Sequence, residues 1–361
     1  MKIAVTGTRG IPDILGGVET HCEELFPLIA AKGYDVTLVR RSAYARDSRN
    51  EYKGVKLIDL YAPKSKSFEA FTHTFAAVLK ARRLNVDILH VHAIGPALVI
   101  PIARMLGLKV VFTHHGQDYN REKWGRTAKT ALKLGERMGC MFANEVIVIS
   151  EAIKDCVKSK YGRTDVRLIR NGVPAPVFVP ETRWIESLGV RHGEYIFAMG
   201  RFVPEKNFHL LIETFASLNQ SACKLVLAGD ADMENTYSSN LKECAHKNGV
   251  ILTGFIKGEK LHALLTHARA FVLPSTHEGL PISLLEAMSY SLPVIASNIS
   301  ANLETELSPD SYFRVGDRQH LSEKIETIIS TPFHRVKYSM EDYRWDKIAE
   351  QTIEVYKEMF S

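Results

Sequence analysis

Residues 270–297, AFVLPSTHEGLPISLLEAMSYSLPVIAS, place two short apolar runs, AFVLP and LPVIAS, on either side of the segment STHEGLPISLLEAMSYS. Continuous rather than alternating apolar runs are typical of strands that are buried on both faces of a parallel sheet. Proline is accepted at the first position of a helix, so we expect a helix to begin at Pro281. The stretch therefore predicts a strand–helix–strand unit, the repeating element of parallel α/β folds.

The same alternation runs through the whole chain of 361 residues, a length that suits two domains. In the first predicted helix, the apolar positions Val18, Cys22, Leu25, Phe26 and Ile29 fall on one face. The proline-rich stretch 171–184 interrupts the pattern, because proline excludes regular strand pairing. We predict two doubly wound α/β domains, 1–175 and 176–344. Further predicted strands are KIAVTG, DVTLVR, VKLIDL, DILHVH, KVVFTH, EVIVIS and VRLIR in the first half, and YIFAMG, KLVLAG and VILTG in the second.

Composition narrows the class of protein. Hydrophobic residues make up 45% and charged residues 24%, as in ordinary globular proteins. The five cysteines show no C-x-x-C spacing, which indicates reduced thiols rather than disulfides or a zinc site. No apolar run approaches the roughly 18 residues of a spanning helix, and the N-terminal run is too short for a signal peptide. We expect a cytoplasmic protein without a membrane span.

Charge is distributed unevenly along the chain. Residues 1–175 carry 28 Lys and Arg against 17 Asp and Glu, a net +11, whereas residues 176–361 carry a net −6. At 100° per residue, Arg126, Lys129, Lys133 and Arg137 fall on one helical face. This face is either ordinary solvated surface or a peripheral contact with an anionic membrane. Nucleic acid is a poorer explanation, because no recognition motif accompanies the charge.

Ligands of open parallel sheets bind beyond the carboxyl ends of the strands. Arg201 and Lys206 follow the predicted strand YIFAMG, in GRFVPEKN, where two cations suit a diphosphate; Asn207 is suited to cap the next helix. Gly16 and Gly17, before the first helix, allow close approach of an anion. The alternatives are solvated surface charges for the cations and a plain turn for the glycines.

Acidic residues and histidines raise the question of a metal. Asp230 and Asp232 form a D-x-D pair, but cations nearby make a metal redundant, and we expect loop hydrogen bonding instead. His90 and His92 share a strand face, with one expected in the core, and a two-histidine metal site lacks a clear third ligand. His114 and His115 come at the end of another predicted strand, KVVFT. Of the four histidines, His115 is the best placed to touch a ligand.

Two carboxylates mark the quoted stretch. With the helix beginning near Pro281, the backbones of Glu278 and Glu286 lie about 9–12 Å apart. The carboxyl pairs of glycoside hydrolases are separated by about 5–5.5 or 6.5–9.5 Å, so this spacing disfavours a hydrolytic pair. Two acids that grip one long ligand, with the helix N-terminus facing a phosphate between them, fit better.

With these motifs assembled, the chain resembles glycosyltransferase family 4, whose two-domain fold is called GT-B. GRFVPEKN, AGD and EGLPISLLE, the last matching the E-x7-E motif, come in the family's order. TGTRGIP, GGVETHCEEL and HGQDYNREKWGR resemble a bacterial subgroup that includes rhamnosyltransferases of surface-polysaccharide assembly. The resemblance implies two Rossmann-like domains whose parallel sheets face a central cleft, and a final helix, residues 345–361, that returns to the first domain.

The resemblance also implies roles for individual residues. Arg201 and Lys206 would bind the donor diphosphate, Glu286 the ribose, and Glu278 would lie by the transferred sugar. Gly16 and Gly17 match the glycine loop near the phosphates, Gly279 and Leu280 the start of the donor-binding helix, and His115 a position that often contacts the sugar. The family is regarded as retaining and metal-independent, so no cofactor is expected.

The sequence thus favours a glycosyltransferase that moves a hexosyl or deoxyhexosyl group from a UDP-, GDP- or dTDP-sugar to a glycan or a lipid-linked acceptor, in the biosynthesis of surface polysaccharide or glycoconjugates. Two alternatives stay open. Arginines in VRRSAY, where NAD enzymes carry an acid, allow an NADPH-dependent oxidoreductase. A non-catalytic GT-B sugar-binding protein is the other alternative.

Overall fold

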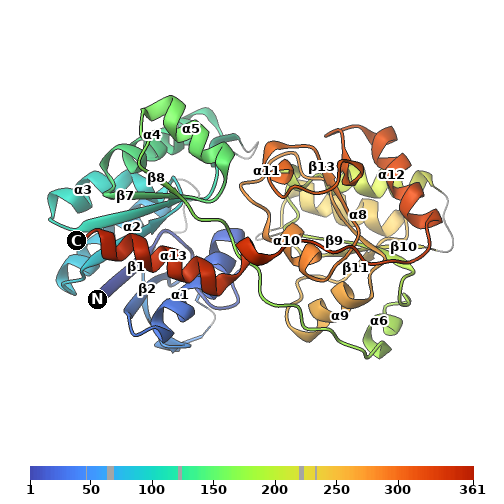
Figure 1. Ribbon diagram of the computed structural model, residues 1–361, viewed down its shortest axis with the longest axis horizontal. Coiled ribbons are helices and arrows are strands. Elements are labelled where there is room, and N and C mark those ends of the chain that lie inside the picture. Colours follow the sequence, from blue (N-terminus) through green and yellow to red (C-terminus); the bar gives the residue numbers. More distant parts are fainter. Residues whose placement is uncertain (46, 63–68, 121–123, 219–222, 232–233) are drawn as a thin grey trace. The chain divides into compact units, whose positions relative to one another are not determined.

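The computed structural model describes residues 1–45, 47–62, 69–120, 124–218, 223–231 and 234–361 (Figure 1). The chain divides into two compact units, Met1–Gly172 with Asp342–Ser361, and Val173–Glu341. The domain limits expected from the sequence lie three residues from these limits.

The first unit is built on an eight-stranded sheet in the order β3-β4-β2-β1-β5-β6-β7-β8, counted over the described residues. All neighbouring pairs are parallel except β3 with β4. The strands are β1 Lys2–Thr6, β2 Asp35–Arg41, β3 Glu51–Tyr52, β4 Val55–Leu60, β5 Ile88–His92, β6 Lys109–His114, β7 Glu145–Val148 and β8 Val166–Leu168.

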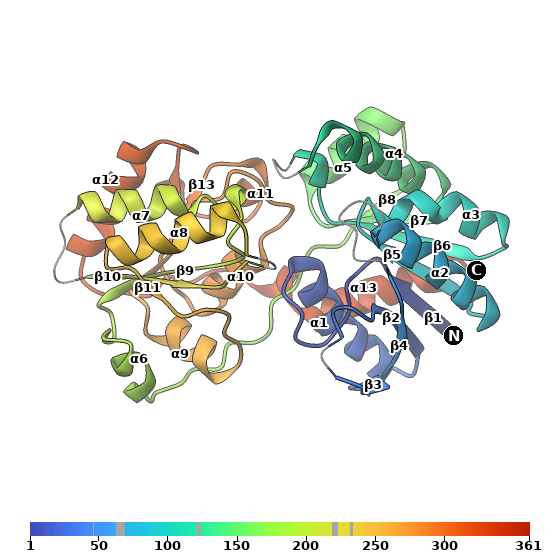
Figure 2. The ribbon, with the colours of Figure 1, turned by 180° about the vertical axis from the view of Figure 1, so that it is seen from behind.

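Helices cover both faces of this sheet (Figures 1 and 2). They are α1 Gly17–Ala31, α2 Glu69–Arg83, α3 Ile100–Met105, α4 Arg126–Phe142, α5 Glu151–Tyr161 and α13 Trp345–Glu358, with short 3-10 turns η1 Pro96–Val99, η2 Asp118–Asn120 and η5 Glu341–Tyr343. Gly139 of α4 lies against the Phe112 ring, leaving no room for a Cβ. Phe112 and Val111 point to opposite faces of β6, and Val111 belongs to the cluster under α1 and α13. Helix α4 therefore lies on the face opposite α1.

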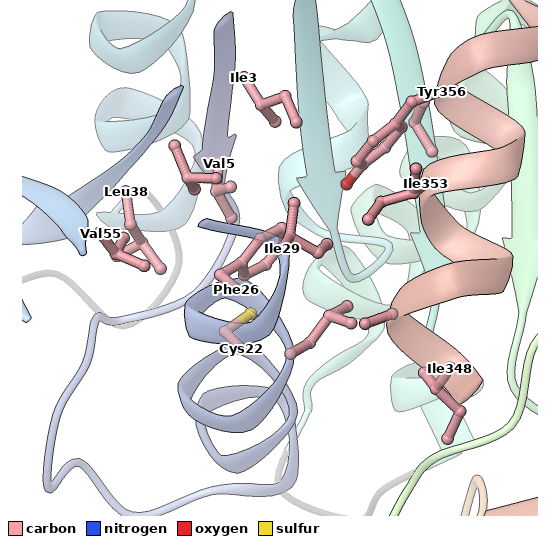
Figure 3. Packing of buried hydrophobic residues seen from close by; sticks show 14 of the residues in the cluster. Ile3, Val5, Cys22, Phe26, Ile29, Leu38, Val55, Ile348, Ile353 and Tyr356 are labelled. Atoms are coloured by element: carbon pink, nitrogen blue, oxygen red, sulfur yellow. The ribbon is translucent and has the colours of Figure 1, made fainter. Parts of the chain in front are cut away.

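The core of the first unit lies between the sheet, α1 and α13 (Figure 3). Phe26 and Ile29 of α1 meet Ile348, Ile353 and Tyr356 of α13, all of them buried. The C-terminal helix is amphipathic in sequence, and its apolar face fills this space. The last residues of the chain therefore complete the core of the first unit.

The second unit has a six-stranded parallel sheet in the order β11-β10-β9-β12-β13-β14, again counted over the described residues. One face is covered by α7, α8 and α12, which share a hydrophobic cluster with alternate residues of the strands. The strands are β9 Tyr195–Met199, β10 Lys224–Ala228, β11 Ile251–Leu252, β12 Ala270–Leu273, β13 Val294–Ser297 and β14 Tyr312–Phe313. The helices are α6 Arg183–Ser187, α7 Phe208–Ser217, α8 Thr236–Lys247, α9 Glu259–His267, α10 Ile282–Ser289, α11 Ser300–Leu303 and α12 Arg318–Ser330, with turns η3 Pro204–Lys206 and η4 Pro309–Ser311.

Local sequence explains several helix ends. Ser150 accepts a hydrogen bond from the N–H of Ile153 at the start of α5, and Gly162 in the left-handed region ends that helix. Asn235 and Ser238 form a reciprocal capping box at the start of α8. These caps satisfy backbone N–H groups that would otherwise have no partner at the helix start.

The predicted fold class, two parallel α/β domains, is confirmed, but details differ. The two-residue strands β3 and β14 were not predicted, because polar residues flank them and neither lies in a continuous apolar run. The helix expected to begin at Pro281 begins at Ile282, and Pro281 is its N-cap with extended ψ of 109°. Asn207 does precede α7, but in the left-handed region and without a side-chain capping bond.

No helix among the described residues is both long and apolar enough to cross a bilayer.

The α1–α13 contact gives a stability prediction. Ile348 is fully buried, so Ile348→Ala should lower the free energy of unfolding of the first unit by about 2–5 kcal/mol, through lost burial and a cavity. Urea denaturation followed by circular dichroism measures this. Glu350→Ala is the matched control on the same helix. Its pair with Lys32 leaves the Glu350 side chain 66% exposed, so we expect a loss under about 1 kcal/mol. Equal losses in the two variants would contradict this packing.

Candidate functional site

Two loops meet at the carboxyl edge of the second sheet, after β9 and β10. The loop after β9 carries Arg201 and, at the end of η3, Lys206. A Cβ on Gly229 would lie 1.9 Å from the carbonyl oxygen of Gly200, and both glycines have positive φ. Only glycine allows the two backbones to come this close, so the loop that carries the two cations is held against its neighbour.

Lys206 lies beside Glu278, which comes from the loop after β12. The Lys206 Nζ is 2.6 Å from Glu278 Oε1, and the same carboxylate oxygen accepts a hydrogen bond from Ser275 Oγ at 2.6 Å. The two charged side chains are only 15% and 13% exposed. A charge this far out of water needs a partner, so each fixes the other at the strand ends.

Helix α10 begins next to this pair. Its N-cap, Pro281, has no side-chain acceptor to offer the first N–H groups of the helix. Ser283 Oγ in the first turn is buried and finds no hydrogen-bond partner within the described part of the chain. Glu286, three residues on, lies on the same side of the helix and is partly exposed, whereas the residues around it are buried. Gly279 and Leu280 form the connection between Glu278 and this helix start.

A chain of buried polar groups supports Ser275. Ser297 Oγ, at the end of β13, donates to the Ser275 carbonyl oxygen, and Asn302 Nδ2 donates to the Ser297 carbonyl at 2.8 Å. The backbone N–H of Thr276 donates to the Glu205 carbonyl at 2.9 Å, joining this loop to the one that carries Lys206. Sequence reasoning did not identify Ser275, Ser297 or Asn302. Ser275 and Ser297 carried the signal of a place at or just after a strand end, whereas Asn302 lies in α11 and carried none.

Of the D-x-D pair, only Asp230 lies among the described residues. Asp230 Oδ1 is 2.9 Å from Lys242 Nζ and also accepts from the backbone N–H of Ala231 at 2.8 Å, as the loop-bonding interpretation expects. Asp232 lies outside the described residues.

In the first unit, Gly16 and Gly17 stand at the start of α1. Gly16 is the N-cap with φ 146°, and a Cβ there would meet the Glu19 carboxylate at 2.0 Å. Glu19 accepts hydrogen bonds from the backbone N–H of Arg9 at 3.0 Å and from Arg9 Nε at 3.2 Å. The positive end of the helix is therefore already facing a carboxylate, and an anion near these glycines would lie next to an Arg9–Glu19 pair.

His90 and His92 are both fully buried, although only one of them was expected in the core. His90 is a core residue, with Nδ1 2.6 Å from Tyr356 Oη and Nε2 2.7 Å from Thr113 Oγ1. His92 Nδ1 lies 2.9 Å from His115 Nε2. His21 from α1 joins that pair, with a ring centroid 4.8 Å from that of His115. His21 is the third histidine that the sequence did not reveal, although its place beside Cys22, on the buried side of the predicted helix, was a signal.

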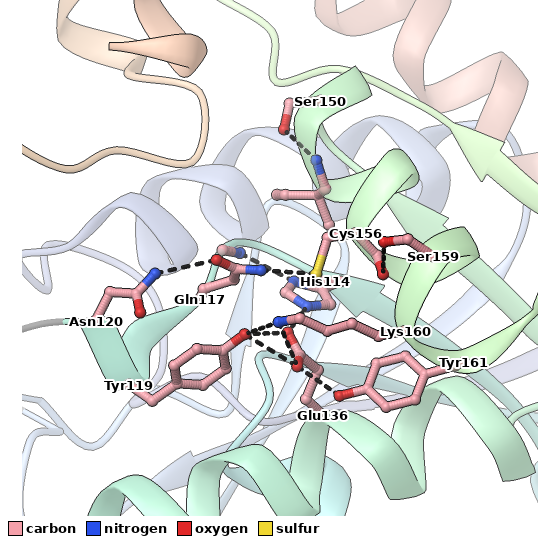
Figure 4. A network of polar contacts seen from close by, with 12 residues as sticks. His114, Gln117, Tyr119, Asn120, Glu136, Ser150, Cys156, Ser159, Lys160 and Tyr161 are labelled. Carbon is pink, nitrogen blue, oxygen red and sulfur yellow. Dashed lines mark hydrogen bonds and ion pairs between the residues drawn. The ribbon is translucent and has the colours of Figure 1, made fainter.

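His114 belongs to a separate network (Figure 4). Its Nε2 is 2.9 Å from Glu136 Oε1, and the buried Glu136 also accepts hydrogen bonds from Tyr119 and Tyr161. Burial would raise the pKa of Glu136, but hydrogen bonds from His114 and Tyr161 outweigh it, so the pKa is lowered. The network fastens the segment after β6, which begins with His115, to α4 and α5.

The arginines that suggested NADPH are already engaged. Arg40, 2% exposed, lies 2.6 Å from Asp59 and 3.2 Å from Asp47. Arg41 Nη1 is 3.2 Å from Glu69. A cofactor phosphate would have to displace these carboxylates from buried guanidinium groups, so the arrangement argues against that alternative.

The basic face of α4 has a mixed character. Arg126, Lys133 and Arg137 are exposed, together with Leu134, Met141 and Phe142. Lys129 is partly buried, and Lys133 Nζ lies 5.5 Å from the centre of the Tyr119 ring.

Two family models match the chain, one to each half. Residues 15–175 match "Glycosyltransferase Family 4", and residues 181–345 match "Glycosyl transferases group 1". The chain belongs to the family 4 glycosyltransferases. This glycosyltransferase is 25% identical to an uncharacterised glycosyltransferase of Methanocaldococcus jannaschii, over 99% of this chain and 98% of that one. It is 26% identical to a UDP-Gal:α-D-GlcNAc-diphosphoundecaprenol α-1,3-galactosyltransferase of Escherichia coli, over 83% and 81% of the two chains.

Solved structures give the same fold. A sucrose-phosphate synthase of Thermosynechococcus elongatus superposes with a TM-score of 0.84, 21% identity and 99% of both chains covered. The HepE protein of Anabaena, solved with UDP-glucose, superposes with a TM-score of 0.75, 20% identity and 99% and 98% coverage. The fold of this glycosyltransferase is therefore GT-B, as the resemblance implied.

Buried neutral histidines give a pH prediction. Burial lowers the pKa of His90 to about 3 and that of His73 to about 4, from 6.5. Below pH 6.5 the unfolded chain then binds more protons than the folded chain, so stability falls as the pH falls. Each such histidine contributes a slope of up to about 1.4 kcal/mol per pH unit.

Urea denaturation between pH 7 and pH 5 measures this slope, in a range above the titration of ordinary carboxylates. His73→Gln should make this slope shallower by up to about 1.4 kcal/mol per pH unit, the contribution of one proton. A wild-type stability that does not change over this range would contradict the burial of these rings.

Proposed function

We propose that the second unit binds a nucleoside-diphosphate sugar and that the enzyme transfers the sugar to a hydroxyl of a glycan or a lipid-linked acceptor. The observation that carries the proposal is the Lys206–Glu278 pair, held at 2.6 Å beside the uncapped start of α10. A cation and the N–H groups of a helix start suit a diphosphate, and a carboxylate suits sugar hydroxyls.

The donor would lie along this edge in one direction. Lys206 and Arg201 would contact the diphosphate, the N–H groups from Gly279 onward would add to its stabilisation, and Glu286 would accept hydrogen bonds from the ribose. Lysine has three N–H donors, so Lys206 can contact phosphate while it keeps Glu278 oriented. The unpartnered Ser283 Oγ supports a polar ligand at this helix start.

Transfer breaks the bond between the anomeric carbon and the phosphate oxygen and forms one between that carbon and the acceptor oxygen. We propose retention without a resident metal: the departing phosphate accepts the proton of the acceptor hydroxyl on the same face. Lys206 and Arg201 would stabilise the negative charge that develops on the phosphate, an electrostatic contribution. Glu278 would position the sugar and face the positive charge on its ring. His115 would contact the sugar from the first unit, and Gly16 and Gly17 would lie near the phosphates.

Relatives support the direction of this proposal. The Anabaena HepE protein was solved with UDP-glucose, and the name of the E. coli relative states a UDP-galactose donor and a diphosphoundecaprenol acceptor. A role in surface-polysaccharide or glycoconjugate synthesis, with a UDP-, GDP- or dTDP-sugar as donor, follows as part of the proposal.

Lys206→Ala tests the diphosphate assignment. We expect kcat/KM to fall by about 10²–10³-fold, the usual cost of removing a group that stabilises developing charge. A thermal-shift screen of UDP-, GDP- and dTDP-sugars first selects the donor, because binding to the folded state raises its melting temperature. Nucleotide release with that donor and a panel of acceptors then measures transfer.

Lys247→Ala is the control, since that lysine is 69% exposed and pairs only with Glu243 in the contacts found for its side chain. Near-wild-type turnover of Lys206→Ala would disprove the diphosphate role. Tight donor binding without turnover on any acceptor would instead support a non-catalytic sugar-binding protein. Saturable NADPH binding without nucleotide-sugar binding would support the oxidoreductase.

A lipid-linked acceptor would make the basic face of α4 useful as a peripheral membrane contact. Each cation near an anionic surface contributes about 1 kcal/mol. Exposed Leu134 and Met141 beside these cations suit the boundary between headgroups and acyl chains.

Sedimentation with vesicles containing anionic phospholipid tests this contact. Binding should weaken by at least tenfold when Lys129, Lys133 and Arg137 are all changed to Gln, and rising salt should weaken the wild type in the same way. The control changes Lys56, Arg183 and Lys247, which are exposed elsewhere on the chain. Equal binding of the two triple variants would show that the basic face of α4 is an ordinary solvated face.

A further inference from the structure

Three histidines from separate elements of the first unit meet at one point. His21 comes from α1, His92 is the last residue of β5, and His115 directly follows β6. One ring nitrogen from each residue lies within 4.8 Å of the other two. His21 and His92 are buried and His115 is partly exposed, so the cluster has one side toward solvent.

Asn171 fixes how His21 presents itself. The Oδ1 of Asn171 is 3.0 Å from His21 Nδ1. An amide oxygen only accepts hydrogen bonds, so Nδ1 carries the proton, and Nε2 of the neutral ring keeps its lone pair. A partner that holds the distal nitrogen of a histidine in this way is the usual second-shell arrangement of histidine metal ligands.

His92 has an unmet requirement. Its Nδ1 is 2.9 Å from His115 Nε2, and one proton serves that contact. Its other nitrogen, Nε2, is buried and has no hydrogen-bond partner among the residues that the structure describes, and the whole residue is 0% exposed. The nitrogen that faces His115 is Nδ1, so a neutral His92 with its proton on Nε2 has the Nδ1 lone pair to offer a metal ion.

The dimensions suit a metal ion. With Zn–N bonds of about 2.0–2.1 Å, tetrahedral ligand nitrogens lie about 3.3 Å apart. The His92–His115 contact at 2.9 Å is already close to that value, so small side-chain rotations complete the triangle. Phe26 and Trp345 pack edge-on against His92 and His21, which gives the cluster an apolar wall.

We propose that His21, His92 and His115 form a binding site for one divalent transition-metal ion that favours imidazole, such as Zn²⁺. Three histidines leave one coordination position for water or an added ligand. The site is distinct from the diphosphate-binding residues of the second unit. A bound ion would also withdraw His115 from the sugar, so Zn²⁺ would inhibit transfer rather than assist it. This inhibitory role rests on the proposed function.

Zn²⁺ alone, titrated calorimetrically into the chelator-treated full chain without any nucleotide sugar, tests the site. We expect one ion per chain and a raised melting temperature. His21→Gln should abolish this binding event, and Asn171→Ala should weaken it by about 10–100-fold, as loss of a second-shell partner does. Circular dichroism of the metal-free variants checks their folding. If His21→Gln does not fold, Zn²⁺ titration of Asn171→Ala and His115→Gln tests the site instead.

His192→Gln is the matched control. His192 Nδ1 lies 2.9 Å from His267 Nδ1 in the second unit, and no third ligand was found beside that pair among the described residues. Zn²⁺ binding that persists in folded His21→Gln, or that disappears in His192→Gln, would overturn the proposal.

Inhibition provides the second readout. Zn²⁺ should lower the transfer rate of the wild type at concentrations that leave the rate of His21→Gln, measured relative to its own metal-free value, unchanged. Equal inhibition of both would overturn the inhibitory role. If the chain transfers no sugar at all, the proposed function fails, whereas the calorimetric titration still decides the metal site.

Discussion

Burial of each parallel sheet on both faces is the constraint on which the rest of this structure depends. Strands such as β1 and β9 have almost no side chain left for solvent, so polar chemistry is confined to the loops at their ends. In the first unit the cover of one face depends on α13, whose Ile348 and Tyr356 reach the sheet from the far end of the chain. The core that supports the first unit's loops therefore closes only when the last helix is in place.

Charged groups at these strand ends occur in pairs, because a single charge withdrawn from water is costly. Lys206 faces Glu278, and Arg9 faces Glu19. His114, at the end of β6, contacts Glu136 of α4, which also accepts hydrogen bonds from two tyrosines. Each pair fixes a loop as well as balancing a charge. The edge of the second sheet is thus prepared for a ligand by groups that already hold one another, which reduces the reorganisation that binding requires.

Sequence periodicity predicted most of the architecture correctly. Continuous apolar runs identified every described strand of four or more residues. A single helical face identified the buried residues Cys22, Leu25, Phe26 and Ile29 of α1, but not Glu19, His21, Glu23 or Pro27. Strands β3 and β14 were missed because neither lies in a continuous apolar run, unlike the equally short β11. The residues Ser275, Ser297 and Asn302 were missed because their bonds join separate loops, and nothing in the neighbouring sequence records the register that brings them together.

By itself the sequence determined the fold class, the family and the placing of polar residues after the strands. The fold class and the placing of polar residues follow from local spacing, since neighbouring residues carry the period of a helix or strand. The family followed from the resemblance of the assembled motifs. Tertiary structure alone decided which of those residues meet. It paired Lys206 with Glu278, engaged Arg40 and Arg41 with acids, and brought His21 beside His92 and His115. The physical reason is that such contacts depend on strand order and helix packing, which fix the positions of residues far apart in the chain.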